Sequence, residues 1–193
     1  MTLRAGLSYQ LIIETAALLA DQYGLETLTL TQIAEYLGVR KPSLYNHIGG
    51  LPDVQQGLAV FAMQELRIKL SDAAIGLSKR DAIMAIAKAY RRFAHERPGL
   101  YRAIVARPNR DNAAVKEAIQ KLMHIIAIVL GAYKLNASDS THALRGLRSL
   151  MHGFVSLEAA GWFVQPVERD ESYHQLINTF IHGIEALAAE RSK

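Results

Sequence analysis

The sequence has no cysteine among its 193 residues. Disulfide bonds, thiolate metal sites and cysteine nucleophiles are therefore excluded, and the composition fits a reducing cytosol. Proline is scarce: the five prolines stand at expected helix starts or between helices, at positions 42, 52, 98, 108 and 166. Because proline disrupts helix interiors, this distribution leaves long segments free to be helical.

Long hydrophobic runs are also missing. The two most apolar stretches are "LIIETAALLA", which Glu14 interrupts, and "HIIAIVLGAY". Both are shorter than the roughly 20 residues that a membrane-spanning helix needs, and the first lacks the core of a signal peptide. We expect a cytoplasmic protein with no membrane partner.

The first fifty residues show no strong charge imbalance. The chain carries a net charge of +4, which weakly favours an anionic partner. Its first fifty residues, however, hold only three basic residues (Arg4, Arg40, Lys41) against four acidic ones. Any prediction of DNA binding there must therefore rest on the geometry of a motif.

Apolar residues recur at helical spacing along almost every long segment, and no segment alternates as a strand does. The fold class is therefore predicted to be all-α, with about nine helices. Their expected ranges are Ser8–Tyr23, Leu30–Leu37, Lys41–His47, Leu51–Ala74, Lys79–Glu96, Gly99–Ala106, Asp111–Tyr133, Ser138–Phe163 (with Ser138 or Asp139 as its cap) and Asp170–Glu190.

Two of these helices are short and lie close together in "TLTQIAEYLGVRKPSLYNHI". Thr29 and Gln32 have capping-box spacing, and Gly38 can adopt the left-handed conformation that ends a helix. The outer face of the second helix is polar, since it carries Pro42, Ser43, Tyr45 and Asn46. Two helices joined in this way indicate a helix-turn-helix that can enter a DNA major groove. An ordinary helical hairpin in a core is the alternative.

The same stretch resembles the signature of the TetR family, in which a helix reading "IA..LGV" is followed by "LY.HF". The segment "LLADQYGLETLTL" resembles the family's first helix, while "FAHERPGLYRAI" and "LMHGFVSLEAAGWF" resemble the subgroup with an HG…LE helix, a WHG-type domain. The resemblance implies a DNA-binding domain over residues 1–50 and a ligand-binding and dimerisation domain over residues 51–193. It further implies a repressor that binds a palindromic operator as a homodimer and is released by a small molecule.

The resemblance also assigns roles to residues. Thr29 and Thr31 would face phosphates, Arg40, Lys41 and Ser43 would approach base edges, and Tyr45 and His47 would grip phosphates. With Pro42 and Asn46 on the same outer face, these residues form the predicted DNA-binding set.

The chain departs from the family pattern at three positions. Ile48 replaces a phenylalanine, Arg40 replaces a small N-cap residue, and Leu51 stands where a lysine often touches phosphate. Arg4 would contact the minor groove or phosphate, or belong to a disordered tail.

Apolar stripes on the last two helices predict a dimer interface, and the family resemblance implies that these helices pair into a four-helix bundle. The interface residues would be Leu147, Leu150, Phe154, Tyr173, Leu176, Ile177, Phe180 and Ile184. The glycines at 146 and 153 would allow close helix approach. The core of a single chain is the alternative.

The middle helices would enclose an apolar effector, as the family resemblance implies. The candidate lining residues are Phe61, Met84, Tyr90, Tyr101, Met123, His124, Phe154 and Trp162, since methionines and aromatics suit a mostly apolar small molecule. Simple core packing is the alternative for each.

No phosphate loop, zinc pattern or Ser-His-Asp set can be placed, so an enzyme, a metal and a cofactor are not expected. His95 and His124 lack ligand spacing, and His152 suits a structural hydrogen bond. The arginines 91, 92, 97, 102, 107 and 110 would bind an anion or, preferably, form a salt-bridged surface. The rival function is a helical interaction module that has kept the fold but lost DNA binding, which Leu51 favours.

Overall fold

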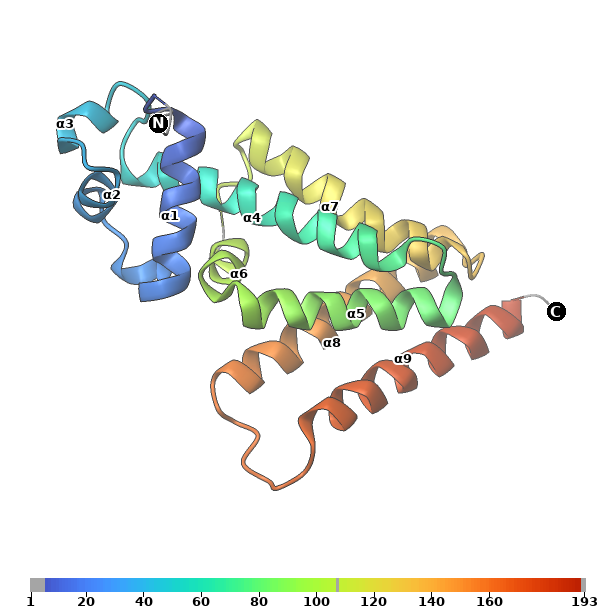
Figure 1. Ribbon diagram of the computed structural model, residues 1–193. Coiled ribbons are helices and arrows are strands. Elements are labelled where there is room, and N and C mark those ends of the chain that lie inside the picture. The colour runs from blue at the N-terminus through green and yellow to red at the C-terminus, as the bar shows by residue number, and fades with distance from the viewer. Residues whose placement is uncertain (1–5, 107, 192–193) are drawn as a thin grey trace. The chain divides into compact units, whose positions relative to one another are not determined.

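The computed structural model describes residues 6–106 and 108–191, and every regular element in them is helical (Figure 1). The all-α prediction is confirmed for this part of the chain. The elements are α1 (Tyr9–Tyr23), the 3-10 turn η1 (Leu25–Thr27), α2 (Leu30–Leu37), α3 (Lys41–Leu44), α4 (Leu51–Ala74), α5 (Lys79–Glu96), α6 (Pro98–Val105), α7 (Ala113–Gly131), α8 (Ala137–Ala159) and α9 (Arg169–Arg191).

The chain divides into two compact units, Met1–Glu65 with Ala94–Gln120 and Leu66–Phe93 with Lys121–Lys193. Helices α4, α5 and α7 each contribute residues to both units. The first unit thus extends beyond the predicted boundary at residue 50, because the first turns of α4 and all of α6 belong to it.

Helix α1 forms the centre of the first unit, with α2 beside it and α3 against α2 (Figure 1). It begins at Ser8, whose hydroxyl accepts a hydrogen bond from the Leu11 amide at 3.2 Å. It ends at Gly24, whose φ of 93° is open to glycine at little cost. Its inner face is apolar except for the buried Thr15, and Ile12 and Ala16 have no exposed surface.

Helix α6 is fixed to α1 within the same unit. The Asp21 carboxylate accepts hydrogen bonds from the backbone amides of Gly99 at 2.8 Å and Leu100 at 3.1 Å, and Arg97 donates to it at 2.5 Å. A Cβ on Gly99 would collide with the backbone of Ala20. Only glycine therefore allows α6 to approach α1 this closely.

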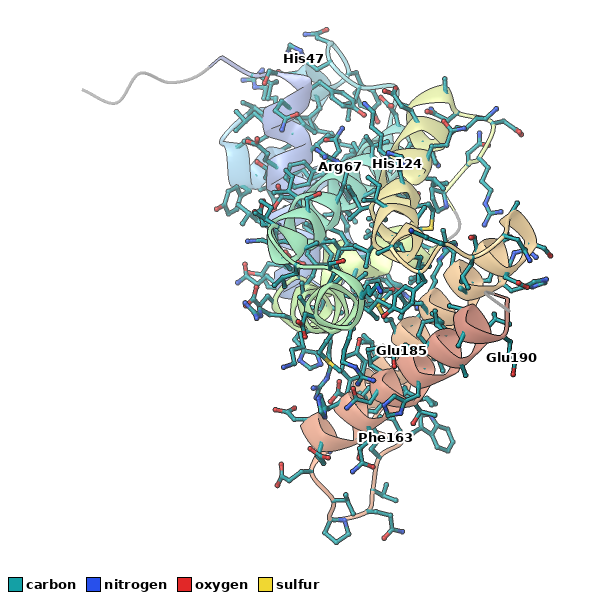
Figure 2. All side chains as sticks on the ribbon, turned by 90° about the vertical axis from the view of Figure 1, so that its right-hand side faces the viewer. His47, Arg67, His124, Phe163, Glu185 and Glu190 are labelled. Carbon is teal, nitrogen blue, oxygen red and sulfur yellow. The ribbon has the colours of Figure 1, made fainter. Side chains whose placement is uncertain are left out.

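Helix α8 begins earlier than predicted. Asn136, rather than Ser138 or Asp139, is its N-cap, since the Asn136 side chain accepts from the Asp139 amide at 2.8 Å. The helix also ends at Ala159 rather than Phe163, and Gly161 then takes a left-handed φ of 72°. Phe163 consequently lies on the connection to α9 (Figure 2).

Candidate DNA-binding surface

Both ends of α2 are built as the sequence predicts. The Thr29 hydroxyl accepts from the Gln32 amide at 3.2 Å, and the Gln32 side-chain oxygen accepts from the Thr29 amide at 2.8 Å. This reciprocal pair confirms the capping box. Gly38 adopts φ 65° and ψ 31°, the left-handed conformation expected at a helix end.

Helix α3 is shorter than predicted. It covers Lys41–Leu44, and the residues up to His47 form a turn. The amides of Tyr45 and His47 bond to carbonyls three residues back, at 3.2 and 2.9 Å, so the chain tightens instead of continuing the α-helix. Leu44 and Ile48 are both buried and anchor this segment to the core.

The predicted DNA-binding residues that lie in this region point outward. Thr29, Thr31, Arg40, Lys41, Pro42, Tyr45, Asn46 and His47 are exposed, and Ser43 is half-buried. Tyr45 keeps 54% of its surface, and His47 lies at the periphery of its unit (Figure 2). The segment is therefore not the buried hairpin that the sequence left open. Arg4 lies outside the described residues.

The start of α4 is acidic where the family pattern often has a lysine. Asp53 stands in its first turn and accepts a hydrogen bond from the Gly49 amide at 2.9 Å. Leu51 is half-buried and offers no charge. A carboxylate near the helix start repels phosphate, so α4 provides less attraction for a DNA backbone than the pattern implies.

The predicted effector-lining residues are divided between the two units. Phe61 and Tyr101 belong to the first unit, and the other six belong to the second. His124 and Trp162 are exposed, Trp162 by 71%, so the described chain by itself does not enclose them. Tyr90, Tyr101 and Phe154 are buried, and Met84 and Met123 are half-buried.

Most of the predicted dimer-interface residues are core residues of a single chain. Five are buried within it, namely Leu147, Phe154, Tyr173, Ile177 and Ile184. They contribute to the core of the single chain, and the dimer interface stays a prediction. Leu150, Leu176 and Phe180 keep part of their surface. Of the two predicted close-approach glycines, Gly146 faces Phe180 of the same chain, while a Cβ added at Gly153 would meet no described atom outside its own turn within 4 Å.

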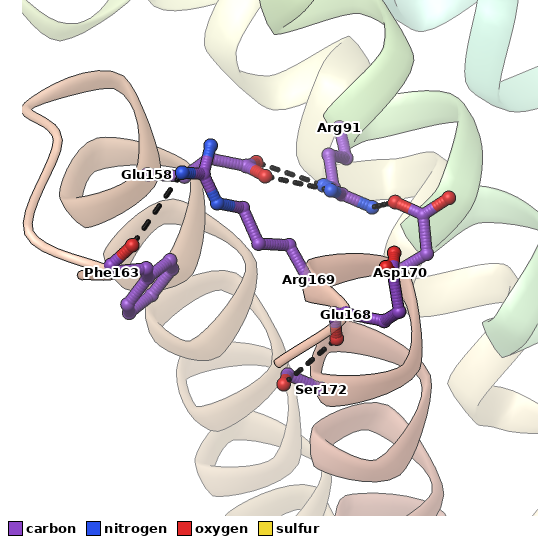
Figure 3. A network of polar contacts seen from close by, with 7 residues as sticks. All are labelled: Arg91, Glu158, Phe163, Glu168, Arg169, Asp170 and Ser172. Carbon is purple, nitrogen blue, oxygen red and sulfur yellow. Dashed lines mark hydrogen bonds and ion pairs between the residues drawn. The ribbon is translucent and has the colours of Figure 1, made fainter. Parts of the chain in front are cut away.

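Glu158, the glutamate of the "HG…LE" segment, pairs with Arg91 of α5 (Figure 3). Two hydrogen bonds of 2.8 and 2.7 Å join them, and Asp170 accepts a third from Arg91 at 2.8 Å. The guanidinium carbon also lies 5.5 Å from the Phe154 ring centre and 5.3 Å from that of Tyr173. Hydrogen bonding to Glu158, partly opposed by burial, raises the pKa of Arg91.

Two of the other arginines of the middle segment follow the predicted salt-bridged pattern. Arg97 pairs with Asp21 and lies 3.7 Å from Glu65, and Arg102 pairs with Glu26 at 2.6 Å. Arg92 and Arg110 are exposed, and position 107 lies outside the described residues.

The histidines form no metal site in the described part of the chain, where no group of three or more His, Cys, Asp or Glu side chains could hold an ion. His152 instead lies 3.4 Å from the Ser156 hydroxyl, in line with a structural hydrogen bond. Within the same described ranges, no helix combines the length and apolar character needed to cross a bilayer.

An exposed, capped helix-turn-helix on an all-helical scaffold defines a class of DNA-binding proteins. Residues 83–180 match the family model described as the tetracyclin repressor-like C-terminal domain. The HTH-type transcriptional regulator YobS of Bacillus subtilis (strain 168) is 36% identical over 95% of this chain and 96% of its own. The regulator Rv0681 of Mycobacterium tuberculosis is 30% identical over 94% and 83%. The chain belongs to the TetR family of helix-turn-helix transcriptional regulators.

Solved structures show the same fold. A protein from Rhodococcus sp. RHA1 superposes with a TM-score of 0.80 at 22% identity, covering 95% of this chain and 98% of that one. A TetR variant from Acinetobacter baumannii AYE, in complex with minocycline, gives 0.71 at 22% identity, covering 94% and 98%.

Proposed function

We propose that this regulator represses transcription as a homodimer on a palindromic operator and is released by a small molecule. The observation that carries the proposal is the outward-facing set from Arg40 to His47, mounted on buried Leu44 and Ile48. The proposal includes a dimer because one short helix reads few base pairs and two-fold symmetry doubles the site.

The exposed side chains suit distinct tasks on a duplex. Lys41 can donate to guanine acceptors in the major groove, while Thr29 and Tyr45 can donate hydroxyl hydrogen bonds to phosphate oxygens. Contacts of the second kind set the register of the protein on DNA, and those of the first kind select the sequence.

Release by an effector requires only that the ligand has different affinities for two conformers. Helix α4 runs without interruption from the first unit into the second, so it offers a rigid element through which ligand and DNA sites can be coupled. The minocycline complex of the A. baumannii TetR variant supports ligand binding in proteins of this fold.

The first test is a gel-shift with DNA that flanks the coding sequence. The double variant Lys41→Ala/Tyr45→Ala should bind this DNA about a hundredfold more weakly, because a good base contact contributes roughly 1–3 kcal/mol and a phosphate contact is lost as well. The matched control, Lys88→Ala/Tyr23→Ala, removes the same side-chain types from exposed sites outside the motif. Equal affinity of both variants would show that the DNA face is wrongly assigned.

The rival hypothesis is that the protein is an interaction module without DNA binding. The acidic start of α4 favours this hypothesis. A regulator should show steep salt dependence, since each neutralised phosphate releases counterions. Failure to bind flanking DNA even at low salt would support the interaction module.

A further inference from the structure

A groove of about 210 Å³ opens on the first unit, where α1, α4 and the start of α7 meet. All of its lining belongs to that unit. Helix α4 supplies a stripe with helical spacing, and the described residues of the lining are Tyr9, Gln10, Ile13, Asp53, Gln56, Gly57, Val60, Phe61, Gln64, Asn112 and Ala114. The site is thus formed by three segments that are distant in sequence.

Gly57 determines the shape of this groove. A Cβ at that position would collide with the Tyr9 hydroxyl and with the Ile13 side chain. Because glycine has none, Tyr9 and Ile13 lie directly against the backbone of α4. Tyr9 remains 41% exposed, so part of its side chain is left open to an occupant of the groove.

The groove combines an apolar surface with a polar rim of one charge sign. Ile13, Val60 and Phe61 supply the apolar part, and glutamine and asparagine side chains supply neutral donors and acceptors. Among the residues that the structure describes, Asp53 is the only formally charged one in the lining. The pKa of Tyr9 is raised, first by burial and then by the negative charge of Asp53. The charge of Asp53 therefore acts on the Tyr9 phenol.

We infer that this groove binds a small organic cation, a protonated amine carried on a compact apolar body. The ammonium group would pair with Asp53 and approach the Tyr9 ring, which attracts cations through its π face. The apolar body would cover Val60 and Phe61. The volume of 210 Å³ lies below the roughly 300–1,000 Å³ of sites for drug-sized ligands, so the ligand is about the size of one substituted ring.

An occupant of this groove bridges α1 and α4 next to the helix-turn-helix. It would favour conformers in which the first turns of α4 keep their place on α1, and so change operator affinity in proportion to that preference. The inference that the groove binds a cation depends only on the groove, whereas the effect on operator affinity also rests on the proposed function.

The test is a calorimetric titration of the full chain with 2-phenylethylamine and, as a carboxylate of similar size, 3-phenylpropionate. The amine should bind saturably and the carboxylate should not. Asp53→Asn keeps an acceptor for the Gly49 amide but removes the charge, so affinity for the amine should fall about tenfold. Val60→Phe should abolish binding by filling the groove.

The matched control is Asp72→Asn, which removes an exposed carboxylate from the same helix, about 28 Å further along at 1.5 Å per residue. It should bind the amine as the unaltered chain does. Absence of saturable binding, equal affinity for the carboxylate, or indifference to Asp53→Asn and Val60→Phe would overturn the inference.

A gel-shift on the same samples separates the two proposals. Operator binding without amine binding would refute the groove site and support the proposed function as a regulator. Amine binding that meets the criteria above, with no DNA binding, would support the groove site and refute the proposed function.

Discussion

Two buried tyrosines of the second unit differ in one respect, the fate of their hydroxyl groups. Tyr173 donates a hydrogen bond to the Ala87 carbonyl at 2.9 Å. The Tyr133 hydroxyl is buried without a hydrogen-bond partner among the described residues. A buried hydroxyl without a partner opposes folding, whereas a bonded one contributes about 1 kcal/mol.

Phenylalanine substitutions should therefore have opposite effects at the two sites. Tyr133→Phe should leave the free energy of unfolding unchanged or raise it, and Tyr173→Phe should lower it by about 1 kcal/mol. Urea denaturation of both variants measures the difference. A loss of stability in Tyr133→Phe equal to that in Tyr173→Phe would show that the Tyr133 hydroxyl has a partner.

His152 makes stability depend on pH. Burial, and after it the charge of Arg148, lowers the pKa of His152 below its ordinary value of 6.5. A histidine with a lowered folded pKa contributes its full stability above pH 6.5, and this contribution is lost as the pH falls through the folded value. His152→Gln should therefore lose less stability between pH 7.5 and 5.5 than the unaltered chain. Urea midpoints at both values, with exposed His142→Gln as the control, measure this.

At the scale of elements, helices with one strong end signal could be predicted from the sequence and others could not. The bounds of α2 follow the prediction because Thr29 and Gly38 are unambiguous. The start of α8 differs from the prediction, because Asn136, Ser138 and Asp139 are all good N-caps and only the folded chain selects one of them. The end of α3 depends on how Leu44 and Ile48 pack, which local sequence does not show.

The same limit applies to the sites. The outward-facing set from Arg40 to His47 was predictable because it follows from spacing within a few residues. The pair of Arg91 and Glu158 joins positions 67 residues apart, and the groove needs Tyr9, Val60 and Asn112 together. Hydrophobic periodicity also identified the buried stripes of α8 and α9 but could not tell a chain's own core from an interface.

The contact of α6 with α1 gives a prediction at this scale. Gly99→Ala should lower the free energy of unfolding by about 1–3 kcal/mol, because its Cβ meets backbone that cannot move aside. Gly131→Ala, at a helix position with no atom within 4 Å of the added carbon, should be neutral or stabilise by about 0.4–1 kcal/mol. Thermal unfolding compares the two. Equal melting temperatures would mean that α6 can shift away from α1 at no cost.

At the scale of the whole molecule, we expect the proposed dimer to form through a flank of α8 and α9. Their most buried residues are turned into the chain, and the adjacent stripe keeps surface at Leu150, Gly153 and Leu157 on α8 and at Leu176, Phe180, Gly183 and Leu187 on α9. The positions repeat at three and four residues, so each set lies on one side of its helix. A Cβ added at Gly153 or Gly183 would meet no described atom of the chain outside its own turn within 4 Å, which leaves room for a second helix.

If two chains pair through this stripe, Gly183→Arg should separate them, because a charged side chain would enter the space where the helices meet. We expect light scattering to report the mass of one chain for this variant and of two for the unaltered protein. Operator affinity should fall by several orders of magnitude, since the two half-sites would then be bound independently. Ala127→Arg, on an exposed position of α7, should keep both the doubled mass and the affinity. A Gly183→Arg variant that retains both would place the dimer interface elsewhere on the chain.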